Sequence, residues 1–225
     1  MLTVVAQVRN TDRWLWWDWI SRNTDLIWEA FREHVVLTVA AVGLGLLIAV
    51  PLGVAAARWR RVYGPSLAFT GILYTIPSLA AFAFLIPYTG LSRTTALIPL
   101  TSYTLLILLR NVVTGLDQVP DDVKDAADGM GYTRLKRLVR VELPLALPAI
   151  MAGIRVATVT IIGLTAVSGL LAIPNLGFLM RRGFQLPMRT AITVGITLSI
   201  LLAVAADLVL VGVQRLLTPW TRTER

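Results

Sequence analysis

Few side chains in this sequence could take part in covalent or metal chemistry. The chain has no cysteine and a single histidine, His34, so neither a thiolate nor a histidine cluster is available to hold a metal ion. Neither Lys124 nor Lys136 follows a Gly-x-x-x-x-Gly pattern, and the sequence therefore contains no phosphate-cradling loop for a nucleotide. The apolar stretches hold no paired carboxylates. We expect no catalytic residue, no metal and no cofactor.

Two charged residues stand inside otherwise uncharged apolar runs, Arg155 and Asp207. An isolated charge at mid-bilayer costs roughly 2.5 to 3.5 kcal/mol on insertion scales. With a rise of 1.5 Å per residue, both charges lie about 9 to 12 Å from the end of their run that the basic residues assign to the cytoplasm. This matched depth predicts an ion pair between them. The alternative is that each side chain extends separately toward the interface.

The longest polar stretch, residues 110–145, carries helix signals of its own. Pro120 suits a first helical position, and the acids that follow it suit a first turn, so a short helix over about 120–128 is expected. Its apolar face is narrow and consists of Val123, Ala126, Ala127 and Met130. Thr133 is a plausible cap for a second helical unit, which Pro144 should end.

So short a helix is marginal alone in water, and its apolar face needs a partner. Either it docks on another protein, or it folds back on the membrane surface or under the helices of its own chain. If it docks, Ala127→Glu should break the association.

The elements that position these residues are membrane spans. Of 225 residues, 56 % are hydrophobic and 15 % are charged, whereas a soluble domain carries about 25 % charged residues. Uncharged runs predict five transmembrane helices, over about 35–57, 66–87, 94–113, 147–171 and 191–213. The net charge of +8 falls between these runs, as expected beside anionic headgroups, and does not favour nucleic-acid binding.

Basic residues indicate the orientation. Placing the loop after the first span, residues 110–145 and the tail after Asp207 on one side collects 12 Lys and Arg, against eight on the other side. By the positive-inside rule the N-terminus lies outside and the C-terminus lies in the cytoplasm. The Trp-rich residues 1–34, with Trp14, Trp16, Trp17 and Trp19, suit an interfacial segment.

The polar stretch resembles the coupling motif of permease subunits of bacterial ABC importers, which reads Glu-Ala-Ala, three residues, Gly, nine residues, Ile-x-Leu-Pro. This sequence meets the spacing in full, with Asp for Glu and Val for Ile. The matching positions, with the tyrosine that follows the glycine, are Asp125, Ala126, Ala127, Gly131, Tyr132, Val141, Leu143 and Pro144.

Longer segments are similar to permeases of osmoprotectant importers, which carry glycine betaine, choline, carnitine or proline betaine. They are GILYTIPSLAAFAFLIP at 71–87, LLRNVVTGL at 108–116, ELPLALPAIMAGIRVATV at 142–159 and ADLVLVGVQRLLTP at 206–219. The chain departs from these relatives at Tyr74, where Gln is common, and at 172–177, where a Gly-rich turn is common.

The resemblance implies an all-α, polytopic permease of the type I ABC importer class: an interfacial segment over 1–34, a transmembrane domain over 35–219 with a coupling segment over 117–145, and a cytoplasmic tail over 220–225. It implies a non-catalytic subunit in a bacterial cytoplasmic membrane. Its implied partners are ATPase subunits, a second identical or related permease and an extracytoplasmic substrate-binding protein.

Two other functions are compatible with these residues. One is an ABC permease for another small solute, such as an amino acid; the other is an ion-coupled secondary transporter, which should show buried coupling acids and an internal repeat. Candidate pathway residues are Tyr74, Thr75, Pro77 and Ser78, whose polar and helix-breaking groups interrupt the second span.

Overall fold

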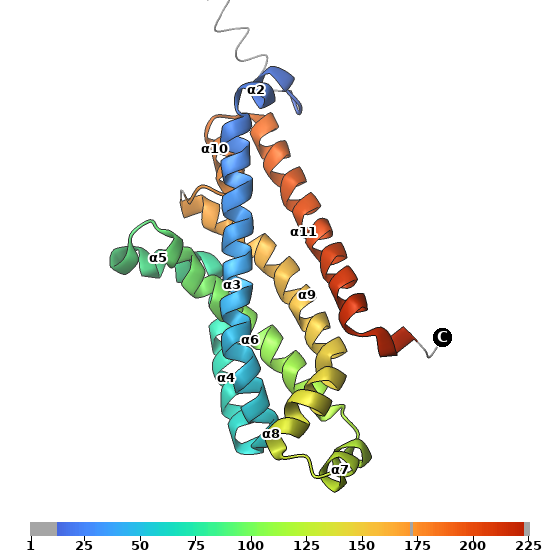
Figure 1. The fold of residues 1–225 in the computed structure, drawn as a ribbon. Helices are drawn as coiled ribbons and strands as arrows, with labels where there is room; N and C mark the ends of the chain where they lie inside the picture. The colour runs from blue at the N-terminus through green and yellow to red at the C-terminus, as the bar shows by residue number, and fades with distance from the viewer. Residues whose placement is uncertain (1–12, 172, 223–225) are drawn as a thin grey trace, which may run out of the picture. The chain divides into compact units, whose positions relative to one another are not determined.

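The computed structural model of the chain describes residues 13–171 and 173–222. Over these residues the chain is helical and contains no strand, which confirms the all-α class (Figure 1). The elements are α2 (Trp17–Arg22), α3 (Thr24–Arg58), α4 (Arg60–Thr75), α5 (Ser78–Thr89), α6 (Arg93–Asp117), α7 (Asp121–Gly129), α8 (Arg134–Arg137), the π-helix η1 (Leu138–Glu142), α9 (Leu143–Ser168), the 3-10 turn η2 (Gly169–Leu171), α10 (Leu176–Gln185), α11 (Arg189–Leu217) and the 3-10 turn η3 (Pro219–Arg222).

Four helical stretches among the described residues are long and apolar enough to cross a membrane: Thr24–Arg58, Arg93–Asp117, Arg134–Leu171 and Arg189–Leu217. A fifth span exists only if the bent pair α4 and α5 is counted as one. The uncharged run predicts a single span over 66–87, but the helix is broken at Ile76 and Pro77. Proline has no N–H to donate and disfavours a helical residue before it, which explains the break.

The first long helix starts earlier than the apolar run suggests. The run begins at Val35, whereas α3 begins at Thr24 and includes polar residues on its first three turns. Residues 1–12 of the Trp-rich segment lie outside the described residues, and Trp17 opens the short helix α2. Only part of the segment expected before the first span therefore precedes α3.

The described residues group into two compact units, and several long helices contribute to both. The first unit comprises the described part of Met1–Ala41 with Ile76–Leu100 and Thr160–Ala205. Its core joins Ala30 of α3 to Leu176 and Leu179 of α10. In the same unit Arg93 forms a two-pronged ion pair with the buried carboxylate of Glu33.

A fully buried asparagine organises the turn before α10 in the first unit. The Oδ1 atom of Asn175 accepts hydrogen bonds from the N–H groups of Gly177 and Phe178, and its Nδ2 atom donates to Thr165 O and Ser168 Oγ. A Cβ on Gly177 would lie 1.7 Å from the carbonyl oxygen of Ala166. Close helix packing here thus rests on an asparagine cap and one glycine.

The second unit comprises Val42–Thr75, Thr101–Val159 and the described part of Ala206–Arg225. Small side chains let its helices pack closely, as in other membrane bundles. Ala49, Leu105, Leu108 and Ala157 join α3, α6 and α9. A Cβ on Gly115 of α6 would lie 2.8 Å from the carbonyl oxygen of Ala146 in α9, so a larger residue would push these helices apart. The close contact of α6 with α9 holds the two ends of the polar segment between them.

Candidate functional site

The polar segment between α6 and α9 folds into two short helices, α7 and α8 (Figure 1). Pro120 has an extended backbone and immediately precedes α7, one position before its predicted place as the first helical residue. Asp121 and Asp122 lie in the first turn, where the helix dipole favours acids. Lys124 Nζ pairs with Asp121 Oδ1 at 3.0 Å. The helix thus begins essentially where the sequence indicated.

The end of α7 shows why the motif needs a glycine. Gly131 has φ +76°, in the left-handed region that side chains disfavour. Its N–H donates to Asp128 O, and the N–H of Tyr132 donates to Ala127 O at 3.1 Å. These two bonds form a Schellman motif, which satisfies carbonyls at the helix end and turns the chain sharply.

Replacing Gly131 with alanine should therefore weaken the segment. The left-handed conformation costs a non-glycine residue about 1 to 2 kcal/mol. We expect a lower thermal unfolding temperature for the purified chain. The matched control is Gly129→Ala, because Gly129 is helical and a Cβ there meets nothing within 4 Å. Equal loss in both variants would contradict this role for Gly131.

The apolar face of α7 is divided between the chain's own interior and the surface. Ala127 is 1 % exposed, and Val123 is half-buried. Ala126 is exposed, and Met130 is 68 % exposed. A substitution at Ala127 would therefore disturb the segment itself, whereas Ala126 and Met130 are accessible to another protein. Asp125 is also exposed.

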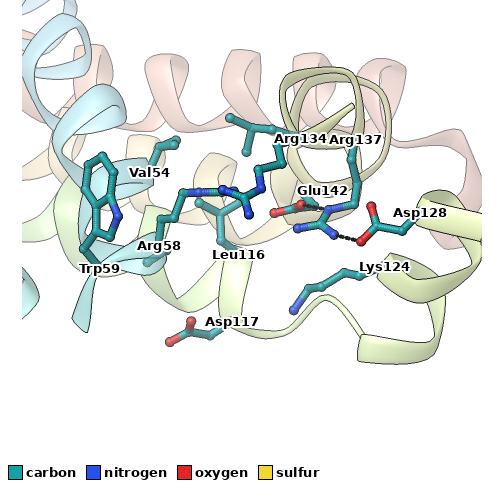
Figure 2. Close-up of a pocket in the computed structure, with 12 residues that line it drawn as sticks. Val54, Arg58, Trp59, Leu116, Asp117, Lys124, Asp128, Arg134, Arg137 and Glu142 are labelled. Carbon is teal, nitrogen blue, oxygen red and sulfur yellow. Dashed lines mark hydrogen bonds and ion pairs between the residues drawn. The ribbon is translucent and has the colours of Figure 1, made fainter. Parts of the chain in front are cut away.

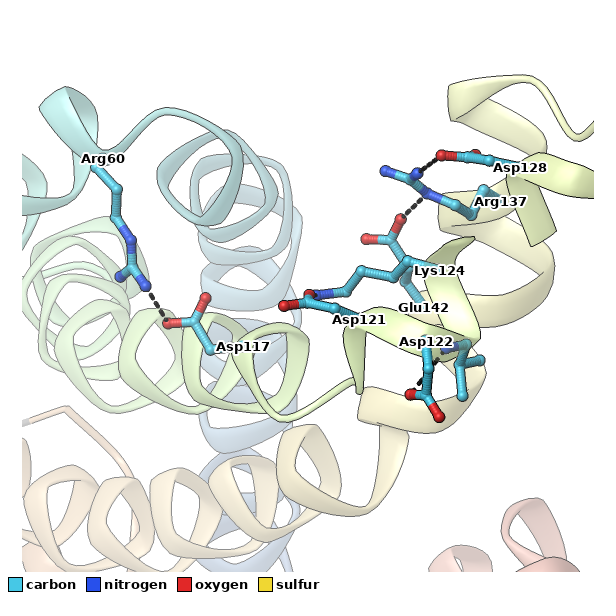
Figure 3. Close-up of polar contacts among 9 residues, drawn as sticks. Arg60, Asp117, Asp121, Asp122, Lys124, Asp128, Arg137 and Glu142 are labelled. Carbon is cyan, nitrogen blue, oxygen red and sulfur yellow. Dashed lines mark hydrogen bonds and ion pairs between the residues drawn. The ribbon is translucent and has the colours of Figure 1, made fainter. Parts of the chain in front are cut away.

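Arg137 connects α7 to the start of α9 (Figure 3). Its Nη1 atom contacts Asp128 of α7, and its Nε atom donates to Glu142 Oε1 at 2.7 Å. The side chains of Arg137 and Glu142 are 17 % and 12 % exposed, so water screens their contact weakly. Arg137 thus joins the end of α7 to the residues that lead into α9.

A π-helix makes this contact geometrically available. Residues Leu138–Glu142 form η1, in which hydrogen bonds join residues five apart, so that Arg137 and Glu142 come onto one side. The helix continues through Pro144 into α9, and the expectation that Pro144 ends it is wrong. The wider turn before Pro144 accommodates the missing N–H that would otherwise interrupt an α-helix. Thr133 does cap α8, as its Oγ1 accepts from Lys136 N–H at 3.4 Å.

The remaining motif residues lie beside this connection. Val141, Leu143 and Pro144 are half-buried, and Leu143 packs against a cluster formed by Val112, Leu116, Ala146 and Ile150. The ring of Tyr132 lies 4.1 Å from Lys136 Nζ. The motif thus maps onto a capped helix, a sharp turn and a helix end anchored in the second unit.

A cavity of about 550 Å³ lies in the second unit, next to α7 (Figure 2). It is lined by Val54, Ala57, Arg58, Trp59, Leu116, Asp117, Lys124, Asp128, Arg134, Arg137, Leu138 and Glu142. Asp117 pairs with Arg60 at 3.2 Å. Ion pairs and charged side chains thus concentrate around the polar segment.

The candidate pathway residues lie around the break between α4 and α5. Tyr74 and Thr75 are exposed at the end of α4, Pro77 is exposed just before α5, and Ser78 is the first residue of α5. The Tyr74 ring packs edge-on against Tyr103. These residues coincide with the helix break rather than with the middle of a continuous span.

Arg155 and Asp207 are brought together. Arg155 Nε donates to Asp207 Oδ1 at 2.8 Å, and Arg155 Nη2 donates to Asp207 Oδ2 at 3.0 Å. The contact joins α9 to α11 in the second unit. The fork of a guanidinium matches the two oxygens of a carboxylate, which makes the contact directional as well as electrostatic. In the described residues no group of three or more His, Asp or Glu side chains could hold a metal ion.

Comparison with protein families gives a match over most of the chain. Residues 49–223 match the model of the family described as binding-protein-dependent transport system inner membrane component. The match includes the polar segment, α9 and α11.

Curated relatives are similar over nearly their full length. The chain is 37 % identical over 200 residues to the glycine betaine/carnitine/choline transport system permease protein OpuCD of Bacillus subtilis, covering 88 % of this chain and 87 % of the relative. It is 36 % identical over 192 residues to the osmoprotectant import permease protein OsmW of Salmonella typhimurium, covering 83 % and 89 %.

A solved structure shares the fold. A chain in inward-facing conformations of the MetNI methionine ABC transporter superposes with a TM-score of 0.77 at 22 % identity, covering 88 % of this chain and 98 % of that one. At this identity the likeness concerns the arrangement of the backbone.

Proposed function

Because the chain belongs to the family of binding-protein-dependent transport system inner membrane components, we propose that it is the permease subunit of an ATP-driven importer for a quaternary-ammonium osmoprotectant. The expected substrates are glycine betaine, choline, carnitine and proline betaine. The observation that carries the proposal is the 37 % identity, over 88 % of the chain, to a permease named for glycine betaine, carnitine and choline. The segment 117–145 would couple the chain to a separate ATPase subunit.

The proposed mechanism follows from the geometry of the polar segment. α7 would sit in a groove of the ATPase, and closure of two ATPases around ATP would move that groove. The Arg137 contacts to Asp128 and Glu142 would pass the motion from α7 into α9. Rigid-body switching of this kind needs a stiff lever, and the Schellman turn at Gly131 supports one.

Further partners complete the proposed assembly. One chain is too small to enclose a pathway, so a second permease, identical or related, is expected beside it. A binding protein outside would hold the quaternary ammonium group in an aromatic cage. The N-terminus would lie outside and the C-terminus in the cytoplasm, and Tyr74, Thr75, Pro77 and Ser78 at the helix break would line the pathway.

Uptake by the assembled transporter tests the function. The tagged chain is purified from its own membranes, its partners are identified by mass spectrometry, and the complex is reconstituted with the binding protein that co-purifies. We expect ATP-dependent uptake of labelled glycine betaine, choline or carnitine, with no competition from amino acids. Uptake of an amino acid in preference to these amines would refute the substrate class. Uphill uptake by the permease without any ATPase subunit would refute the ABC mechanism.

Met130 offers a direct test of docking. Because it is 68 % exposed at the C-cap of α7, a charge there can disrupt a partner's groove without disturbing the chain's own packing. We expect Met130→Glu to lower co-purification of the ATPase about tenfold, as central apolar contacts in an interface do when they are lost. Met130→Leu, which keeps an apolar side chain, should retain the ATPase. Normal ATPase content in the Met130→Glu variant would argue against docking through α7.

A further inference from the structure

The cavity beside α7 contains more positive charge than its acids neutralise. Four cations and three carboxylates line it. All three carboxylates and two of the cations are engaged, in the contacts Asp117–Arg60, Asp128–Arg137, Glu142–Arg137 and Lys124–Asp121. Arg58 and Arg134 remain, and the guanidinium of neither has an ion-pair or hydrogen-bonding partner in the part of the chain that the structure describes.

These two arginines approach the cavity from different helices. Arg58 is the last residue of α3, and Arg134 is the first residue of α8. Figure 2 shows their side chains pointing toward one another across the cavity. Two guanidinium groups that face each other repel, and an anion between them would remove that cost. Guanidinium forks bind the oxygens of phosphate particularly well, because their donors match its geometry.

The rest of the lining suits an amphiphile. Val54, Ala57, Leu116 and Leu138 form an apolar part of the wall. Trp59, which is 60 % exposed, stands at the cavity, and indole rings favour the membrane–water interface. The volume, about 550 Å³, is within the range of small-molecule sites. Basic pockets between helices on the cytoplasmic side are a recurrent mode of lipid headgroup binding.

We propose that this cavity binds the phosphate group of an anionic phospholipid from the cytoplasmic leaflet, with Arg58 and Arg134 as its ligands. The apolar wall contacts the glycerol and the first part of an acyl chain. A phosphate bound there ties the end of α3 to the start of α8, the element that follows the Gly131 turn. The inference goes beyond the proposed transport function, and it uses the proposed orientation only to name the leaflet.

Native mass spectrometry of the assembled transporter tests the site. Phosphatidylglycerol is titrated into the detergent-purified complex, and bound lipid is counted for the unaltered chain and for Arg58→Gln and Arg134→Gln. We expect each variant to weaken binding at one site per chain about tenfold, since each removes charge-assisted hydrogen bonds to one phosphate. Arg58→Lys keeps a charge and should bind more tightly than Arg58→Gln.

Neighbouring arginines provide matched controls. Arg61 and Arg140 are exposed, lie close in sequence to Arg58 and Arg134, and do not line the cavity. Arg61→Gln and Arg140→Gln should bind phosphatidylglycerol like the unaltered chain; equal loss in these controls would show a diffuse charge effect and overturn the site. Complexes are scored only if they still hydrolyse ATP, so that a failed lipid site is separable from a failed transporter.

Two further outcomes decide the identity of the occupant. If inorganic phosphate at millimolar concentration displaces the lipid as well as phosphatidylglycerol itself does, the ligand is a soluble phosphate and the lipid proposal falls. If lipid binds the permease alone but not the permease with its ATPase, the cavity belongs to the partner's interface, and the proposal falls as well. Retention of one Arg58-dependent and Arg134-dependent lipid in the full complex supports it.

Discussion

Replacing Arg137 with glutamine is expected to separate ATP hydrolysis from transport. Arg137 contacts both Asp128 of α7 and Glu142 next to α9, and glutamine can reproduce neither ion pair. Hydrogen bonds to charged groups are among the strong ones, so we expect substrate uptake per ATP hydrolysed to fall about tenfold. The measurement is uptake and phosphate release in the same proteoliposomes.

The surface of α7 that would meet the ATPase is unchanged in this variant, because Ala126 and Met130 lie elsewhere on the helix. ATPase content should therefore be normal. The control is Arg140→Gln, which removes the same charge from an exposed residue of the same segment. An unchanged ratio of uptake to hydrolysis in Arg137→Gln would show that the motion reaches α9 by another route.

The position of α7 could be predicted from the sequence, whereas the contact of Arg137 with Glu142 could not. Pro120, the acids at 121 and 122 and the glycines at 129 and 131 predict α7 and its end, because capping chemistry is local and is carried by residue type. The partnership of Arg137 with Glu142 was not foreseen, since residues five apart do not share a face of an ordinary α-helix. The π-helix η1 lies between the two residues, and the residue pattern does not signal it.

The structure differs from the sequence-based predictions at two other places, α7 and the run over 66–87. The apolar period of α7 groups Ala127 with Ala126 and Met130, whereas the structure buries Ala127 and exposes the other two, because periodicity cannot tell which part of a face the chain's own residues cover. Likewise, the uncharged run over 66–87 predicts one span, because hydropathy carries no information on the backbone and does not register the break at Ile76 and Pro77. The helix-breaking groups around Pro77 do predict an interruption of this run, and in the structure α4 ends just before it.

Substitutions at Arg155 and Asp207 should have the second large effect. Each side chain is about one-third exposed in the chain, so in a membrane each would face lipid or a neighbouring permease unless it kept its partner. Removing one partner leaves an uncompensated charge within an apolar span, which is costly. We expect Arg155→Ala and Asp207→Ala each to lower the thermal unfolding temperature of the chain in detergent by about 5 °C, and to lower uptake as well.

The double variant distinguishes a true pair from two independent charges. If Arg155 and Asp207 stabilise one another, Arg155→Ala with Asp207→Ala should cost clearly less than the sum of the two single changes, because no unpaired charge remains. Arg155→Lys should retain part of the stability, since it keeps the charge but loses the two-pronged contact at 2.8 and 3.0 Å. Strict additivity would mean that each charge finds the interface separately, so that the tie between α9 and α11 contributes nothing to the stability of the folded chain.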